Sequence, residues 1–239
     1  MTDLTERQRN LLEIIIKEHI ESASPISSKY IENEYDLGVS PATIRAEMYE
    51  LIERGYLFQP HTSSGRVPTD KGYRFFVNNL SEREFKKIEG KLIRRVRKMQ
   101  KEIAVRSLFM REFTRFLAQT SSSLTVSYFP QDNILLKEGW GEVLKDPEFN
   151  DVTKVHGFLE MVSDFESNID DFLEPTKPEC VRIYIGSETP FSKKEDFSII
   201  ISSCKIKKKD GCIAIMGPKR MPYEKNISLF DSIIKLLEE

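Results

Sequence analysis

The segment VSPATIRAEMYELIERG, residues 39–55, constrains the fold more than any other part of the chain. Ser40 is placed to act as an N-cap, Pro41 suits the first position of a helix, and Gly55 provides a C-terminal stop. Four apolar side chains fall on one face at helical spacing, namely Ile44, Met48, Leu51 and Ile52. The segment therefore predicts an amphipathic helix that buries this face and presents the opposite one to solvent or to a partner.

Two helices are predicted before this segment. Thr5 and Gln8 have the spacing of a capping box, which begins a first helix that runs from about Thr5 to Ser22. Its core-facing positions recur by threes and fours and are Leu11, Leu12, Ile15, Ile16 and His19. Ser27 is expected to cap a short second helix, which Gly38 closes.

A hairpin and one more helix are predicted after it. YLFQP and GRVPT are short strand candidates on either side of the polar tip HTSS, residues 61–64. Thr69 then caps a helix through DKGYRFFVNNL. Three helices, a two-stranded hairpin and a closing helix within residues 1–80 predict a winged helix-turn-helix domain that binds DNA.

Two elements of this domain hold the candidate DNA contacts. Small and polar residues near the start of the third helix would let its backbone enter a major groove, and we expect contacts from Ser40, Thr43, Arg45, Ala46 and Tyr49. On the wing and just after it, donors to phosphate are expected from His61, Thr62, Ser63, Ser64, Arg66, Lys71 and Arg74. Arg66 beside Gly65 is expected at a tightly turned tip, stiffened by Pro60 and Pro68. The alternatives are a solvated amphipathic helix and a polar hairpin tip; the order of elements favours DNA binding.

Residues 81–121 predict a helical linker and a candidate dimerisation segment. Ser81 and Glu84 form another capping box, and a helical stretch follows to about Gln119, as one long linker helix or as a helix pair. Its apolar seam has one irregular step and consists of Phe85, Ile88, Leu92, Val96, Met99 and Ile103. The helix is basic around Arg94, Arg95, Arg97 and Lys98. A solvated face is the favoured interpretation, and contact with DNA beside the operator is the alternative.

Residues 122–239 predict a second domain of the α+β class. Strands are expected at LTVSYF, CVRIYIG, FSIIISSCKI and GCIAIMG, and helices at DVTKVHGFLEMVSDFESNIDDFL and NISLFDSIIKLLEE. In GPKRMPY, Lys219 and Arg220 follow a glycine as in an anion-binding loop. The favoured interpretation is a structural turn that packs against the long helix.

Composition narrows the function classes. The formal net charge is −2, so any contact with nucleic acid must come from locally placed cations. Cys180, Cys204 and Cys212 lack ligand or disulfide spacing and are expected as small buried hydrophobic residues in a reducing cytoplasm. The three histidines are scattered, so we expect no metal site. No signal-peptide core, membrane span or catalytic motif is evident, so we expect no cofactor, no membrane association and no enzyme.

Several segments together resemble the heat-inducible transcription repressor HrcA family. They are DLGVSPATIRAEM, GYLFQPHTSSGRVPTDKGYRFFV, KDPEFND, VRIYIGSE, DGCIAIMGP and GPKRMPYEKNI, in that order. The resemblance implies a bacterial, cytoplasmic homodimer with an N-terminal winged helix and a C-terminal GAF-like domain. It also implies repression at an inverted-repeat operator of the CIRCE type upstream of heat-shock chaperone operons. The GroE chaperonin would keep the repressor active, and heat stress or chaperonin shortage would release it.

The chain also departs from this family. Between LTVSYFP and ILLKEGWGEVL the family has a central segment with an inserted dimerising domain, whereas here only QDN intervenes. The resemblance therefore implies a shortened member with a reduced GAF-like domain, dimerising through the helical seam or the sheet. A different class, a small-molecule sensor with the helix-turn-helix as its output, would require an apolar cavity in the second domain.

Overall fold

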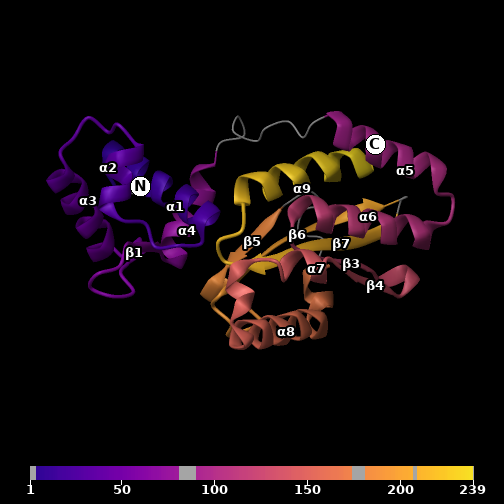
Figure 1. Cartoon of the computed structure of the whole chain (residues 1–239). Helices are drawn as coiled ribbons and strands as arrows, with labels where there is room; N and C mark the ends of the chain where they lie inside the picture. The colour runs from indigo at the N-terminus through magenta and orange to yellow at the C-terminus, as the bar shows by residue number, and fades with distance from the viewer. Residues whose placement is uncertain (1–3, 81–89, 174–180, 207–208, 239) are drawn as a thin grey trace. The chain divides into compact units, whose positions relative to one another are not determined.

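The computed structural model describes residues 4–80, 90–173, 181–206 and 209–238. The chain divides into two compact units, Met1–Leu80 and Ser81–Glu239 (Figure 1). The first unit contains α1 (Glu6–Ser22), α2 (Ser28–Glu34), α3 (Pro41–Glu53), β1 (Leu57–Phe58), β2 (Val67–Pro68) and α4 (Asp70–Asn79). The second contains α5 (Gly90–Glu102), α6 (Arg106–Ser121), β3 (Leu124–Phe129), β4 (Ile134–Glu138), α7 (Trp140–Val143), α8 (Val152–Ser167), β5 (Arg182–Ile185), β6 (Phe197–Ile206), β7 (Lys209–Pro218) and α9 (Tyr223–Glu238).

The predicted order of elements in the first unit is confirmed, and the caps explain why each helix starts where it does. Thr5 and Gln8 make both hydrogen bonds of the capping box. The hydroxyls of Ser27, Ser40 and Thr69 each accept a backbone N–H in the first turn of α2, α3 and α4. These caps are local interactions between residues three apart, which is why the amino-acid pattern alone located them.

The expected role of Gly38 is wrong. Helix α2 already ends at Glu34, and Tyr35 after it is extended. Gly38 has φ +64° in a separate turn, where its N–H donates to the Asp36 carboxylate at 3.1 Å. Instead, α2 is held against α1 by Glu18, whose carboxylate accepts the hydroxyls of Tyr30 and Tyr35 and raises the pKa of each to about 12.

The core of the first unit is formed by the apolar faces of its helices. All five core-facing positions predicted on α1 are buried, and so are Ile44, Met48 and Leu51 of α3. His19 lies in this core, where its Nδ1 is 2.7 Å from the Tyr73 hydroxyl. Helix α1 packs on both α3 and α4, so it is the central element against which the others are positioned.

The second unit is built on one antiparallel sheet in the order β4-β3-β7-β6-β5. Helices α6 and α9 pack on one side of the sheet, and α5 contacts both. Helix α8 covers the opposite side (Figure 1). The α+β class expected for this region is confirmed, with helices on both faces of the sheet.

One strand of this unit differs from the sequence expectation, and the helical stretch takes the second of its two expected forms. Strand β4 was not predicted; it follows β3 directly through the 3-10 turn Pro130–Asp132 and Asn133, which has φ +50°. The long helical stretch is a helix pair, since α5 ends at Glu102 and α6 begins at Arg106. Val96 is fully buried within its own chain. This residue of the expected dimerisation seam therefore cannot contact a second copy. The capping box at Ser81 lies outside the described residues.

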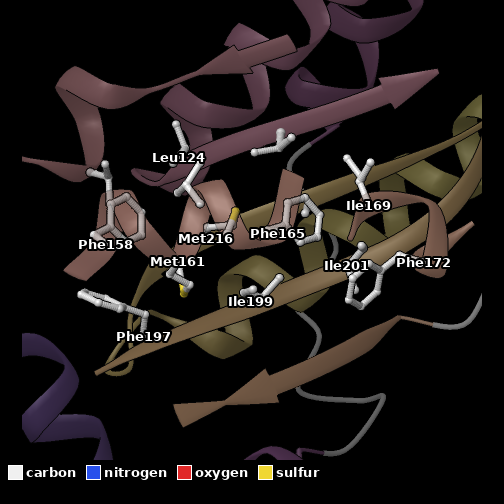
Figure 2. Close-up of a cluster of buried hydrophobic side chains, with 14 of the residues drawn as sticks. Leu124, Phe158, Met161, Phe165, Ile169, Phe172, Phe197, Ile199, Ile201 and Met216 are labelled. Atoms are coloured by element: carbon white, nitrogen blue, oxygen red, sulfur yellow. The ribbon is translucent and has the colours of Figure 1, made fainter. Parts of the chain in front are cut away.

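The space between α8 and the sheet is filled by aromatic and aliphatic side chains. Phe158, Met161 and Phe165 of α8 lie over the side chains of β6 and β7 (Figure 2). The rings of Phe149 and Phe197 stack within this cluster, with centroids 6.1 Å apart and planes 4° apart. Cys212 also lies here, where burial raises the pKa of its thiol to about 12. The expectation of a small buried hydrophobic residue is confirmed for this cysteine.

Candidate nucleic-acid interface

The outer face of α3 is the first candidate surface. Arg45, Ala46 and Tyr49 are exposed, and 61% of Tyr49 is accessible to solvent. The opposite face is buried in the core, so these side chains project from a helix that cannot rotate. Arg45 is held only weakly, because the hydrogen bond that its Nε donates to the Ser28 hydroxyl on α2 is long, at 3.3 Å. The geometry presents a cation and an aromatic ring on a rigid support.

The start of α3 is fixed by its cap. The Ser40 hydroxyl accepts the Thr43 N–H at 3.2 Å and lies 2.9 Å from the Thr43 hydroxyl. Both side chains therefore have a structural role that sequence reasoning assigned only to Ser40. Thr43 is half-buried and Ser40 is exposed. The N-terminal turn of α3 is formed before any ligand arrives.

Contacts with α1 orient α3, and no local pattern in the sequence predicts them. Arg7 makes an ion pair with Glu47, whose side chain is only 9% exposed, and Nε of Arg7 donates to it at 2.7 Å. Gln8 donates to the Glu50 carboxylate at 2.6 Å. These pairs join residues about forty positions apart, which no local pattern reveals. Arg7 also compensates the charge of Glu47 on the helix that carries the candidate DNA contacts.

The hairpin tip, residues 60–64, is the second candidate surface. The Ser64 hydroxyl accepts the His61 N–H at 3.0 Å and donates to the His61 carbonyl at 2.8 Å. Gln59 donates through Nε2 to the carbonyls of Thr62 and Ser64, at 2.8 and 3.0 Å. His61, Thr62 and Ser63 are exposed. The tip is thus closed by its own side chains, with Gln59 as a positioning residue that sequence reasoning missed.

Arg66 is not at the tip, which corrects the sequence expectation. Its N–H donates to the Ile26 carbonyl at 2.7 Å and its carbonyl accepts the Ile26 N–H at 2.9 Å, so it lies where the loop joins β2, bridged to the segment before α2. Nη1 donates to the Ser64 carbonyl at 3.1 Å. The Nε–H is buried and has no hydrogen-bond partner in the described part of the chain. Arg66 therefore braces the hairpin and retains donor capacity.

Gly65 is required for a reason other than the one expected. A Cβ atom at this position would lie 2.5 Å from the carbonyl carbon of Ile26 and 2.6 Å from that of Pro25. The glycine permits the hairpin to approach the α1–α2 connection closely. Its φ lies outside the left-handed region, so a tight turn is not the cause.

Lys71 and Arg74 complete the set of predicted residues. Lys71 donates to the Arg54 carbonyl at 2.7 Å at the C-terminus of α3, and its Nζ lies 4.3 Å from the Tyr56 ring centroid. A cation in this place stabilises the helix end. Arg74 is half-buried on α4. The structure thus gives Lys71 a structural role within the unit.

The turn of GPKRMPY is structural. Arg220 is buried, and its guanidinium makes ion pairs with Asp146 and Glu148, with Nε 2.9 Å from the Glu148 carboxylate. The two carboxylates therefore already neutralise the guanidinium charge that an anion-binding site would need. These carboxylates lie in and just before the 3-10 turn Pro147–Asn150. Packing of the GPKRMPY turn against the long helix stays a prediction.

The described residues contain neither a metal site nor a membrane-spanning helix. Among residues 4–80, 90–173, 181–206 and 209–238, no group of three or more His, Cys, Asp or Glu side chains is arranged to hold a metal ion. Within the same part of the chain, no helix combines the length and apolar character needed to cross a membrane.

Comparison with known proteins decides the family. A family model described as the HrcA protein C terminal domain matches residues 69–227. The chain belongs to the HrcA family. The heat-inducible transcription repressor HrcA of Alkaliphilus metalliredigens is 26% identical over 336 aligned positions, which cover 99% of this chain and 97% of that protein. The repressor of the same name from Thermoanaerobacter pseudethanolicus is 29% identical over 98% of this chain and 96% of its own length.

A solved structure shares the fold of this chain, and membership in the HrcA family shows its functional class. A crystal structure of a hypothetical protein superposes with a TM-score of 0.73 at 20% identity, covering 98% of this chain and 96% of that one. At this identity the match shows a shared fold alone. Membership in a family of transcription repressors places the chain among regulators of transcription and not among enzymes.

Proposed function

We propose that the chain is a homodimeric, heat-inducible transcription repressor that binds an inverted-repeat operator of the CIRCE type. The observation that carries the proposal is the outer face of α3, where Arg45, Ala46 and Tyr49 project from a helix whose other face is buried in the core. This arrangement suits a recognition helix in a major groove. The names of the full-length relatives support the same function.

The hairpin supports a winged helix-turn-helix interpretation of the first unit. β1 pairs with β2 in antiparallel register directly after α3. The exposed donors of its tip, at His61, Thr62 and Ser63, suit phosphate oxygens. Because Gln59 and Ser64 already close the tip, little conformational entropy is lost on binding. We assign base contacts to α3 and positioning contacts to the hairpin, Arg66 and Arg74.

The second unit is proposed to be the regulatory, GAF-like domain. Its five antiparallel strands with helices on both faces are compatible with that fold. The dense aromatic packing beneath α8 supports a domain controlled through protein contacts. A small-molecule sensor would need a cavity in the place that these rings fill.

Control by heat and by the GroE chaperonin is proposed from the family resemblance. If the folded dimer is only marginally stable, warming depletes the DNA-competent form, and a chaperonin that restores it maintains repression. The direct β3–β4 connection supports the proposal that this member lacks a central segment. Because Val96 is buried in its own chain, we place the dimer interface on other residues of α5 and α6 or on the sheet.

The proposal is tested with promoter DNA that contains an inverted repeat and with a scrambled control. The protein should shift the repeat at concentrations that leave the scrambled duplex free, with half-sites about 34 Å apart or a multiple of that distance. Addition of chaperonin after a heat pulse should restore the shift. Equal affinity for the two duplexes would refute sequence-specific repression, and a monomer by light scattering would refute the dimer.

A further inference from the structure

One side of α5 carries a row of cations that the proposed operator contacts do not use. Residues 90–101 contain six Lys or Arg and no Asp or Glu, in a chain whose formal net charge is −2. Four of these cations are spaced i, i+3, i+4 and i+7 along the helix. They form what we call the basic stripe: Arg94, Arg97, Lys98 and Lys101, all exposed. Residues at this spacing share one helix face and span about 10 Å.

The orientation of α5 is fixed, and it directs this stripe outward. Val96, on the opposite side of the helix, is fully buried, and α5 packs against α6 and α9. Arg95 lies off the stripe, with its guanidinium 5.1 Å from the Phe116 ring centroid. The packing thus separates a cation that stabilises the unit from four that line one exposed face.

Within the stripe, Lys98 is only weakly compensated by the acidic group on its own helix. Lys98 lies 3.6 Å from Glu102, and the two side chains are 70% and 62% exposed. Exposed pairs of this kind contribute little and yield to a competing anion. Arg94 donates through Nε to the Gly90 carbonyl at 2.9 Å. Because a carbonyl is neutral, this contact does not compensate the guanidinium charge.

We propose that the basic stripe binds the phosphate backbone of duplex DNA beside the operator, without reading its sequence. The inference rests on the proposed function, because DNA is the polyanion that this chain would meet. Gly90 follows Leu80 by ten residues, a span of at most about 35 Å whatever the conformation. That is about one turn of DNA, so the stripe stays within reach of the backbone next to a site held by the first unit.

The test uses the full chain with Arg94, Arg97, Lys98 and Lys101 all changed to Gln. Affinity is measured against salt on a duplex that just covers the inverted repeat and on one extended by about two helical turns at each end. Wild-type protein should bind the extended duplex more tightly and with a steeper salt dependence. The variant should lose that advantage. Its slope of log affinity against log salt on the extended duplex should be flatter by up to ~3.6 per protomer if all four contacts form.

Two controls separate a site from a general change of charge. Arg111, Lys145, Lys193 and Lys225 are exposed cations elsewhere in the second unit, and changing all four to Gln alters the net charge equally. That variant should keep the length effect, and so should a variant with Arg94→Lys and Arg97→Lys. Thermal unfolding of each variant verifies the fold.

The outcomes distinguish the two proposals. A stripe variant that keeps the wild-type slope and length effect overturns the inference, as does equal loss in the scattered control. If wild-type protein binds the repeat no better than scrambled DNA but still shows the stripe-dependent length effect, the proposed operator fails and the stripe stands. If wild-type protein binds no duplex, both are refuted.

Discussion

The outer face of α3 and the hairpin tip are both polar and exposed, but they are constructed differently. On α3 the caps and the core fix the backbone, and the outward side chains Arg45 and Tyr49 have few contacts of their own. In the hairpin, many side-chain hydrogen bonds are made within the loop itself, by Gln59, Ser64 and Arg66. The outer face of α3 is therefore suited to discriminate between bases, whereas the hairpin is a prefolded support for phosphate contact.

The largest effect is expected from Gly65→Ala. The added methyl group would collide with the backbone of Pro25 and Ile26, and overpacking of this kind costs about 3 kcal/mol in the free energy of unfolding. Binding to operator and to random DNA should fall together as the hairpin is displaced. Urea unfolding and DNA titration measure both effects. Gly90→Ala is the control, since no atom lies within 4 Å of its Cβ position; equal stability of the two variants would contradict the account.

Arg45→Ala tests the α3 side of the comparison. Loss of one good base contact should weaken operator binding by about 1–3 kcal/mol and leave random DNA nearly unaffected, because phosphate contacts remain. Anisotropy titrations with both duplexes measure the ratio. Arg54→Ala, half a turn around from Arg45, serves as the matched control. Unchanged operator affinity in folded Arg45→Ala protein would remove this residue from the interface.

Arg66→Ala tests the hairpin side. If its guanidinium contacts phosphate, specific and random binding should weaken together, and the slope of log affinity against log salt should fall by about one. Thermal unfolding must be measured in parallel, since Arg66 also binds the Ser64 carbonyl. A variant with wild-type affinity and slope on both duplexes would reduce Arg66 to a brace of the hairpin.

The smallest effect is expected from Gln59→Ala. Gln59 orders the tip without contacting DNA, so its loss should weaken both kinds of binding by about 1 kcal/mol through the ordering cost alone. The salt slope should stay as in wild type, which distinguishes it from Arg66. Gln59→Glu should be worse than Gln59→Ala, because a carboxylate would face two carbonyl oxygens. A loss much larger than about 1 kcal/mol in folded Gln59→Ala protein would mean that Gln59 itself contacts DNA.

Local chemistry made most of the first unit predictable. The caps at Thr5, Ser27, Ser40 and Thr69 join residues three apart, so the amino-acid pattern contains the whole interaction. The placement of Arg66 was not predictable in this way. Its partner Ile26 lies forty residues earlier, and only the folded unit brings the two backbones together.

The same distinction between local and long-range interactions applies to the features of the second unit that the sequence did not predict. Strand β4 is five residues long, and its extended form depends on pairing with β3 across a short turn. The break between α5 and α6 falls at residues 103–105, where neither Pro nor Gly interrupts the helical periodicity. The partners of Arg220 lie more than seventy positions away. Tertiary contacts decided the strand and the ion pairs of Arg220, whereas the position of the helix break has no local signal in the sequence.

The most direct test of sequence-specific repression is a footprint of the full chain on a promoter fragment that contains an inverted repeat. We expect protection of both half-sites, centred about 34 Å apart or a multiple of this distance, at a protein concentration that leaves the rest of the fragment open. Arg45→Ala should lose this protection before it loses general retention of the DNA. Uniform protection along the fragment, or none at concentrations that retain the DNA, would contradict the assignment of α3 as the recognition helix.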